Sequence, residues 1–230
     1  MNSHRPPVEA SLLLVDDDRL VADALVAAFD READLKVVGT AASIIALEAL
    51  PARIRRVDIA LVDYRLPDGS GGDAIRRVRR AWPAAVILAV TGAPGEIPLL
   101  ESVAAGASGF VAKSEPYAAL LVAIRRALRG EVILDAEAIR ILAARRDALR
   151  AGERPEMEPL TARERQVLGL LVEGLGSSEI CERLTFGNET LRSHVSSILT
   201  KTGGRNRLEA VAIALAAGAI APPLPGDSRA

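Results

Sequence analysis

Residues 12–18 read Leu-Leu-Leu-Val-Asp-Asp-Asp, an apolar run that ends in carboxylates. Later apolar runs at 59–62, 86–90 and 110–112 are each followed by a polar residue in the same way. In an open parallel sheet, the carboxyl ends of all strands lie at one edge, so residues that follow separate strands converge there. We therefore expect one crevice to contain five side chains, those of Asp16, Asp17, Asp63, Thr91 and Lys113.

Carboxylates gathered in such a crevice repel one another and favour a bound cation. Hard oxygen ligands with few protein contributors suit Mg²⁺. A metal ion beside them allows one carboxylate to act as a nucleophile toward a phosphoryl group. The pattern therefore predicts an ion and phosphoryl site.

Each of these residues has a purely structural interpretation when it is taken alone. A carboxylate at a strand end commonly caps a helix or forms a turn, a threonine there bonds the backbone, and a lone lysine is most often a solvated charge. The occurrence of all of them in this order and spacing favours the phosphoryl site. Asp18 and Asp68 are expected to be turn or capping residues.

Strand and helix patterns alternate along the first half of the chain, between residues 11 and 129. Continuous apolar strands that alternate with amphipathic helices are typical of a parallel sheet covered on both faces. We therefore predict an α/β fold with a doubly wound, five-stranded parallel sheet. The expected strands are 11–15, 36–41, 58–62, 85–90 and 109–112, and helices such as 20–30 and 72–81 lie between them.

Composition and charge restrict the remaining possibilities. The chain has 230 residues, which favours two compact units, and a formal net charge of -1, which confines any nucleic-acid face to a local cluster. The single cysteine, Cys181, and two histidines exclude a disulfide framework and a Cys/His zinc site; Cys181 is expected to be buried. The start lacks a signal pattern, and no apolar run approaches the ~20 residues of a bilayer span. We expect a cytoplasmic protein that does not bind membranes.

The sheet unit is expected to end in a helix that begins at Pro116, runs to about Arg129 and stops at Gly130. A stretch rich in alanine and arginine, 135–150, predicts a helical linker, and the polar 151–158 predicts a flexible tether. The expected boundaries are 10–130 for the sheet unit, 131–158 for linker and tether, 159–221 for a small all-α four-helix unit, and 222–230 for a disordered tail.

Capping residues mark the helices of the second unit. Thr161 and Glu164 form a capping box for the first helix. Ser177 or Ser178 is expected to cap a second helix through residue 184, and Asn188 a third helix to about residue 202.

The short turn between the expected helices 178–184 and 190–202 is what a helix-turn-helix requires. Gly203 and Gly204 end the third helix, and residues 208–217 form a fourth, strongly apolar one. This last helix is either a dimer surface or the element that closes the core of its own unit.

The whole first unit resembles the receiver domain of bacterial response regulators, which implies a flavodoxin-like fold. The segments that carry the resemblance are Leu13-Leu14-Val15-Asp16-Asp17-Asp18, Leu61-Val62-Asp63-Tyr64-Arg65-Leu66-Pro67-Asp68-Gly69-Ser70-Gly71, Val90-Thr91-Gly92 and Gly109-Phe110-Val111-Ala112-Lys113.

The resemblance implies a phosphoacceptor and a metal site. Asp63 would accept phosphate from a sensor histidine kinase. Asp16 and Asp17 would hold Mg²⁺, directly or through water, together with Asp63 and the backbone carbonyl of Arg65.

The resemblance also implies a switch. Lys113 would pair with the phosphoryl oxygens, and Thr91 would donate its hydroxyl to one of them and move toward the site. Phe110 occupies the position of the family's rotating switch aromatic, although taken alone it fits a core residue better than a switch. The modification adds roughly -1.5 to -2 charges at Asp63, and new charge-assisted bonds would pull the loop after the fourth strand inward.

The second unit resembles the LuxR-type DNA-binding domain, and the whole architecture resembles the NarL/FixJ family of transcriptional regulators. The matching segments are Leu160-Thr161-Ala162-Arg163-Glu164-Arg165, Glu173-Gly174-Leu175, Glu179-Ile180, Thr190-Leu191-Arg192-Ser193-His194-Val195, Lys201 and Arg205-Asn206-Arg207. The family often carries Asn-Lys in place of Ser177 and Ser178, and Gly-Val in place of Gly203 and Gly204, so one phosphate contact differs here.

Cationic residues are concentrated on the expected recognition helix and the residues after it, because 190–208 contains arginines and a lysine but no Asp or Glu. A solvated helix face is the alternative for any single arginine, and His194 is either a packing residue or a DNA contact. The resemblance directs Arg192, Ser193 and Ser196 toward base edges in the major groove, and Thr190, Lys201 and Arg205 toward phosphates.

These patterns favour a response regulator in which phosphorylation of Asp63 switches dimerisation and sequence-specific binding of double-stranded DNA. The chain would not be an enzyme beyond its own phosphotransfer and dephosphorylation. Two alternatives stay open: a Mg²⁺-dependent phosphohydrolase that uses Asp63 as nucleophile, and a LuxR-type DNA binder that works without phosphorylation.

Overall fold

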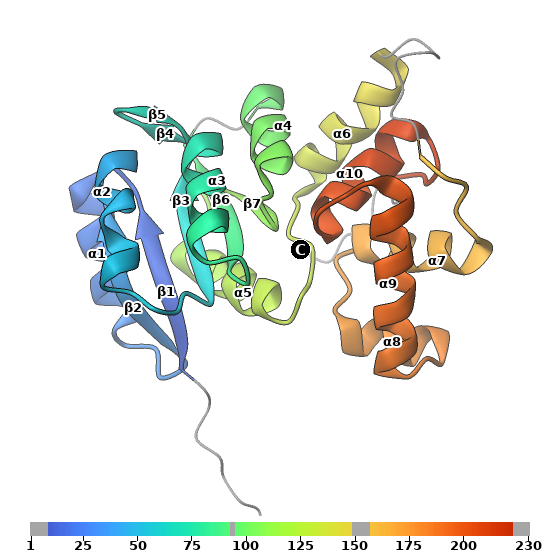
Figure 1. Ribbon diagram of the computed structural model, residues 1–230, viewed down its shortest axis with the longest axis horizontal. Helices are drawn as coiled ribbons and strands as arrows, with labels where there is room; N and C mark the ends of the chain where they lie inside the picture. Colours follow the sequence, from blue (N-terminus) through green and yellow to red (C-terminus); the bar gives the residue numbers. More distant parts are fainter. Residues whose placement is uncertain (1–8, 93–94, 149–156, 223–230) are drawn as a thin grey trace, which may run out of the picture.

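The computed structural model describes residues 9–92, 95–148 and 157–222 (Figure 1). The predictions for most of the tether and for the tail fall outside these ranges. The sheet unit occupies the N-terminal part. The helices α4 (Glu96–Ala105), α6 (Ala136–Ala148) and α10 (Arg207–Ala217) lie where it adjoins the helical C-terminal part (Figure 1). No helix in the described ranges is long and apolar enough to cross a bilayer.

The first unit contains a five-stranded sheet with the order β2-β1-β3-β6-β7, and all neighbouring strands are parallel. This confirms the predicted doubly wound sheet. A short antiparallel hairpin, β4 and β5, follows β3. The strands are β1 Ala10–Val15, β2 Leu35–Ala41, β3 Ile59–Asp63, β4 Arg65–Leu66, β5 Gly69–Ser70, β6 Val86–Thr91 and β7 Gly109–Ala112.

Alternate residues of the strands enter two apolar cores, because successive side chains point to opposite faces of a sheet. Leu13 and Val62 pack with α2, α3 and α4, whereas Leu12 and Leu61 pack with α1 and α5. Both faces are therefore covered. The helices are α1 Arg19–Phe29, α2 Ile44–Glu48, α3 Gly71–Ala81, α4 Glu96–Ala105 and α5 Tyr117–Leu128, with a 3-10 turn η1 at Leu50–Ala52.

The two carboxylates assigned to capping do cap helices. Asp18 accepts from the backbone N–H groups of Leu20 and Val21 at the start of α1. Asp68, in the β4–β5 hairpin, accepts from the N–H groups of Ile44 and Ile45 at 2.8 and 2.9 Å, so it caps α2 from a distant part of the chain. These two backbone hydrogen bonds lower the pKa of Asp68.

The helical part consists of a linker helix and a helix-turn-helix unit. The predicted capping box of Thr161 and Glu164 is confirmed at the start of α7. The left-handed residues Gly203 and Gly218 end α9 and α10. The helices are α6 Ala136–Ala148, α7 Ala162–Val172, α8 Ser177–Leu184, α9 Asn188–Thr202 and α10 Arg207–Ala217.

Two predicted helix caps are wrong by one residue. Gly176 is the N-cap of α8, not Ser177 or Ser178, and Gly187 is the N-cap of α9, not Asn188. At α8 the cap N–H is satisfied by Glu179, and the Ser177 hydroxyl accepts from Arg207. Asn188 instead accepts from the thiol of Cys181, which is half-buried rather than buried.

Thr185 has a left-handed backbone, with φ 57°, at the turn between α8 and α9. This conformation costs a β-branched residue about 1 kcal/mol, and asparagine adopts it more easily. Since Thr185 is exposed, we expect Thr185→Asn to raise the free energy of unfolding by about 1 kcal/mol in urea titrations. Thr185→Val keeps the branched Cβ and should give no gain; equal stabilisation by both variants would contradict a backbone origin.

Candidate functional site

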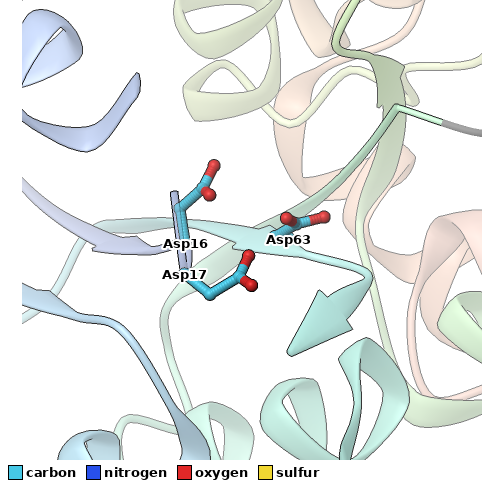
Figure 2. A group of neighbouring side chains, drawn as sticks. All are labelled: Asp16, Asp17 and Asp63. Carbon is cyan, nitrogen blue, oxygen red and sulfur yellow. The ribbon is translucent and has the colours of Figure 1, made fainter. Parts of the chain in front are cut away.

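Asp16 and Asp17 follow β1, and Asp63 is the last residue of β3, so adjacent parallel strands bring their carboxylates to one edge of the sheet (Figure 2). One oxygen atom from each lies within 4.8 Å of the other two. Asp16 and Asp63 are buried and Asp17 is exposed. Backbone N–H groups orient the buried pair, because Asp18 donates to Asp16 and Arg65 donates to Asp63.

Lys113 bridges the two buried carboxylates. Its Nζ lies 2.7 Å from Asp16 Oδ2 and 2.7 Å from Asp63 Oδ2. Burial alone would lower the pKa of Lys113, but hydrogen bonds and charge from Asp16 and Asp63 outweigh burial and raise it. The lysine is therefore held as a cation beside the predicted acceptor oxygen.

The two predicted switch residues lie on β6 and β7, the strands that follow β3 in the order of the sheet. Thr91 is the last residue of β6 and is 1 % exposed, and its carbonyl accepts from the N–H of Lys113 at 2.7 Å. Phe110 on β7 is buried in the core shared with α2, α3 and α4. Thr91 therefore adjoins Lys113 through the backbone, whereas Phe110 belongs to the apolar core on one face of the sheet. Their roles in a switch stay predictions.

The donor set fits a hard divalent cation. Three carboxylates face one ammonium group, so the site has an excess of negative charge when its groups are ionised. Carboxylate oxygens are the ligands that Mg²⁺ prefers, together with its own waters.

Tyr64, directly after Asp63, is a residue that the sequence patterns did not single out. Its hydroxyl donates to Glu101 on α4 at 2.6 Å. Burial and the neighbouring Glu101 carboxylate raise the pKa of Tyr64 to about 12. Only its position beside the acceptor could have drawn attention to it, because nothing in the sequence marks Glu101 as its partner.

The predicted base-reading residues lie on α9 and are open to solvent. Thr190, Arg192, Ser193 and Ser196 are all exposed. His194 stacks on Phe186, with ring centroids 5.0 Å apart. The guanidinium of Arg163 lies over the Phe186 ring, 5.4 Å from its centroid. His194 therefore has a packing role in this conformation.

Lys201, predicted to hold a phosphate, binds Glu164 at 2.8 Å. Glu164 is buried, with 3 % of the residue exposed, and its carboxylate also accepts from Ser197 and from the backbone of Thr161. Burial would raise the pKa of Glu164, but the hydrogen bonds, that from Lys201 first, lower it to about 2. Glu164 therefore connects α7 to α9 as a buried anion.

Because the pKa of Glu164 falls from 4.5 to about 2 on folding, its ionised form stabilises the protein above pH 4.5, and this stabilisation disappears as the pH falls toward 2. Glu164→Gln should lower the free energy of unfolding at pH 7 by about 2 kcal/mol, and the deficit should shrink at pH 3. Urea titrations at both pH values measure it, with the exposed Glu182→Gln as control. A deficit that is equal at both pH values would contradict the assignment.

The segment Arg205-Asn206-Arg207, here called the docking segment, attaches the helical unit to backbone carbonyls of the sheet unit. Arg205 donates to the carbonyl of Ala104 and also pairs with Glu209. Asn206 Nδ2 donates to the carbonyls of Gly106 and Ala107 at 3.1 and 2.9 Å, while its Oδ1 caps α10.

The third docking residue, Arg207, donates to the carbonyl of Gly130 at 2.6 Å and to the Ser177 hydroxyl at 3.1 Å. Burial lowers the pKa of Arg207. A second contact lies nearby, where Arg126 donates to the carbonyl of Gly174 at 3.1 Å. Hydrogen bonds to main-chain oxygens therefore join the two units in both directions: the docking segment donates to the sheet unit, and Arg126 of the sheet unit donates to Gly174 of the helical unit.

The apolar face of α10 is covered within the chain. Leu208, Val211 and Leu215 are buried, and α10 packs against α6 as well as against α4, α7 and α9. A groove of about 390 Å³ remains between α4, α6 and α10, lined by Leu100, Glu101, Ala104, Leu142, Ala212, Ile213 and Ala216. In this conformation α10 closes the core of the helical unit, and the linker helix α6 and α4 of the sheet unit cover the remainder of its apolar surface.

The carboxylate site on the sheet and the helix-turn-helix with its exposed α9 define a class of protein. The chain is a two-component response regulator with a receiver domain followed by a LuxR-type DNA-binding domain. Residues 12–125 match the model of the response regulator receiver domain, and residues 158–214 match that of the bacterial regulatory proteins of the luxR family.

Two curated relatives span almost the whole chain. It is 34% identical over 204 residues to the DNA-binding transcriptional activator DevR/DosR of Mycobacterium tuberculosis, covering 88% of this chain and 93% of the relative. It is 32% identical over 212 residues to the uncharacterized transcriptional regulatory protein YxjL of Bacillus subtilis, covering 90% and 95%.

Solved structures agree with this family. A LuxR-family two-component response regulator from Aurantimonas sp. SI85-9A1 is 31% identical, with a TM-score of 0.54, and covers 60% of this chain and 99% of that chain. RcsB from Salmonella enterica serovar Typhimurium, bound to promoter rprA in the presence of the phosphomimetic BeF3-, has a TM-score of 0.54 at 21% identity over 91% of this chain and 100% of that chain, which supports the fold alone.

Proposed function

We propose that Asp63 accepts a phosphoryl group from a sensor histidine kinase in the cytoplasm, and that the modified chain binds double-stranded DNA as a homodimer. The observation that carries this proposal is the meeting of Asp16, Asp17, Asp63 and Lys113 at the carboxyl edge of the sheet. These are the groups that transfer to a carboxylate requires: an acceptor oxygen, a cation beside it and ligands for a metal ion.

The transfer forms a bond between a carboxylate oxygen of Asp63 and phosphorus, and breaks the bond between phosphorus and the donor histidine. Asp16, Asp17, Asp63 and the Arg65 carbonyl would hold Mg²⁺, which when bound offsets the negative charge of the phosphoryl group and carboxylates. Lys113 lies 2.7 Å from Asp63 Oδ2 and is placed to pair with the phosphoryl oxygens.

The output follows from the charge that the modification adds. New phosphoryl oxygens attract the Thr91 hydroxyl and draw the start of α4 toward the site. A shift of α4 disturbs its contacts with the docking segment, and this favours undocked molecules. Arg205 then becomes available to a DNA phosphate, and α10 to a second copy of the chain.

Incubation with acetyl phosphate tests the acceptor chemistry. We expect covalent labelling of the chain in the presence of Mg²⁺ and its loss when a chelator removes the ion. Labelling that is insensitive to chelation would contradict the proposed metal role, and a complete lack of label with Mg²⁺ would contradict the acceptor role.

The two rival functions give different results. A phosphohydrolase would turn over a small phosphoester continuously, whereas the proposed receiver turns over only its own aspartyl phosphate. A DNA binder that works without phosphorylation would select the same fragments with equal affinity before and after treatment with acetyl phosphate. Selection of bound fragments from random DNA by the treated chain provides the probe and reveals half-site spacing.

A further inference from the structure

The residue after the proposed acceptor is connected directly to the helix that receives the DNA-binding domain. The Tyr64 hydroxyl donates to Glu101 Oε2 on α4 at 2.6 Å. Glu101 also lines the groove between α4, α6 and α10, where Leu100 and Ala104 of the same helix face α10. One hydrogen bond therefore spans from the residue beside Asp63 to the docking face of α4.

The backbone of Tyr64 is held on several sides. Its N–H donates to the carbonyl of Val90 at 2.9 Å, and its carbonyl accepts from the N–H of Gly71 at 2.6 Å. A Cβ added to Gly71 would lie 2.4 Å from the Tyr64 Cα, so α3 begins in close contact with this residue. The Tyr64 backbone is thus tied to β6 and to the start of α3, so a change at Asp63 that shifts this backbone also shifts the Tyr64 ring.

The helix α4 is held less firmly at its start. Its N-cap, Gly95, supplies no side-chain hydrogen bond. Among the described residues, the buried hydroxyl of Ser102 finds no protein partner, and a buried polar group in that situation is a source of instability. Neither feature anchors α4 in its present position, so the contact of Tyr64 with Glu101 contributes to its placement.

The far end of α4 carries the acceptors for docking. The carbonyl of Ala104 accepts from Arg205, and the carbonyls of Gly106 and Ala107, just after the helix, accept from Asn206. Glu101 lies one helical turn before Ala104, so a displacement at Glu101 is transmitted to these carbonyls through the rigid helix. Figure 1 shows α4 between α3 and the helical part of the chain.

We propose that Tyr64 and Glu101 are a positioning pair that couples the state of Asp63 to the placement of α4 and thereby to docking of the DNA-binding domain. The pair touches neither the phosphoryl group nor DNA. Unlike Phe110, which has no hydroxyl, Tyr64 can form a directional bond to α4. This inference rests on the proposed phosphorylation of Asp63 for its input, but the effect on docking is measurable without phosphate.

The matched test compares the two tyrosines of the chain. Tyr64→Phe removes the bond to Glu101, whereas Tyr117→Phe removes a phenol that donates to Glu32, 3.4 Å away, on another part of the receiver domain. The probe is a DNA fragment selected by the full-length wild-type chain. We expect Tyr64→Phe to bind it roughly fivefold more tightly than wild type before phosphorylation, and to gain roughly fivefold less on treatment with acetyl phosphate. Tyr117→Phe should match wild type both in its affinity before phosphorylation and in its gain on treatment with acetyl phosphate.

Two further variants distinguish positioning from a general structural role. Glu101→Gln keeps an oxygen that can accept from Tyr64 and should retain most of the coupling, whereas Glu101→Ala should resemble Tyr64→Phe. The double variant Tyr64→Phe/Glu101→Ala should change the DNA affinity no more than either single variant does, because both substitutions remove the same interaction.

Labelling by acetyl phosphate is measured in parallel and should be unchanged in Tyr64→Phe. The inference is overturned if Tyr64→Phe keeps the wild-type affinities, if it loses labelling, or if Glu101→Ala behaves like wild type. A wild-type chain that takes no label contradicts the proposed function instead, and the affinity change in the untreated variant still tests the pair.

Discussion

Asp63→Asn should reduce labelling by acetyl phosphate to the background of a chelated sample. An amide has no carboxylate oxygen that can form an acyl phosphate, and the replacement also removes the charge that faces Lys113 at 2.7 Å. The variant should fold, since asparagine has nearly the same shape and can still accept from the N–H of Arg65. Circular dichroism and thermal unfolding check that the fold is retained.

Asp18→Asn provides the matched control for this variant. Asp18 is close to the site in sequence but caps α1, and asparagine is an equally good N-cap. Labelling should therefore be unaffected. Label that persists in Asp63→Asn, or that disappears equally in Asp18→Asn, would move the acceptor away from Asp63.

Asn206→Asp should shift the chain toward an undocked conformation. An aspartate caps α10 as well as asparagine does, but it cannot donate to the carbonyls of Gly106 and Ala107. Loss of two hydrogen bonds, each contributing about 1 kcal/mol, disfavours docking by about 2 kcal/mol, or roughly 30-fold, and repulsion between the carboxylate and the carbonyl oxygens adds to this. Small-angle X-ray scattering should record a larger radius of gyration.

The same substitution at Asn188 serves as the control. Asn188→Asp adds the same charge at the start of α9, where the side chain accepts from the thiol of Cys181. It should leave the radius of gyration at the wild-type value. A compact Asn206→Asp chain would show that the docking segment does not hold the two domains together.

The sequence predicted the sheet and the meeting of its polar edge residues because both follow from local rules. Apolar strands that alternate with helices specify a parallel sheet, and the strand ends of such a sheet must converge. Asp16, Asp17 and Asp63 come together for this reason, and Lys113 joins them from β7's end. The roles implied for these residues stay predictions that labelling will test.

The contacts between the domains could not be predicted in the same way. The docking segment donates to carbonyl oxygens of the backbone, and no residue type marks a carbonyl as an acceptor. Arg205 and Lys201 were expected to hold phosphates, and in this structure both have partners within the chain. Arg205 binds the carbonyl of Ala104 and the carboxylate of Glu209. Lys201 binds the carboxylate of Glu164. Clustering of cations along the sequence cannot distinguish a DNA contact from a contact within the protein, so the DNA roles of these residues stay predictions.

The two misplaced helix caps have a related cause. Ser177 and Asn188 are good capping residues by type, but their side chains bind Arg207 and Cys181. A preceding glycine takes the cap position at little cost, since its extended backbone is open to any residue and Glu179 satisfies the N–H at α8. Tertiary partners therefore overrode a local preference.

The central claim is that the state of Asp63 controls DNA binding through docking of the C-terminal domain. Its most direct test is the affinity of the full-length chain for a selected DNA fragment, measured by gel shift with and without acetyl phosphate. Coupling between two sites in a protein is typically worth a factor of about 5 to 150, so we expect at least a fivefold tighter complex with the phosphodonor, and no change in Asp63→Asn. Equal affinity of the labelled and unlabelled wild-type chain would contradict the account.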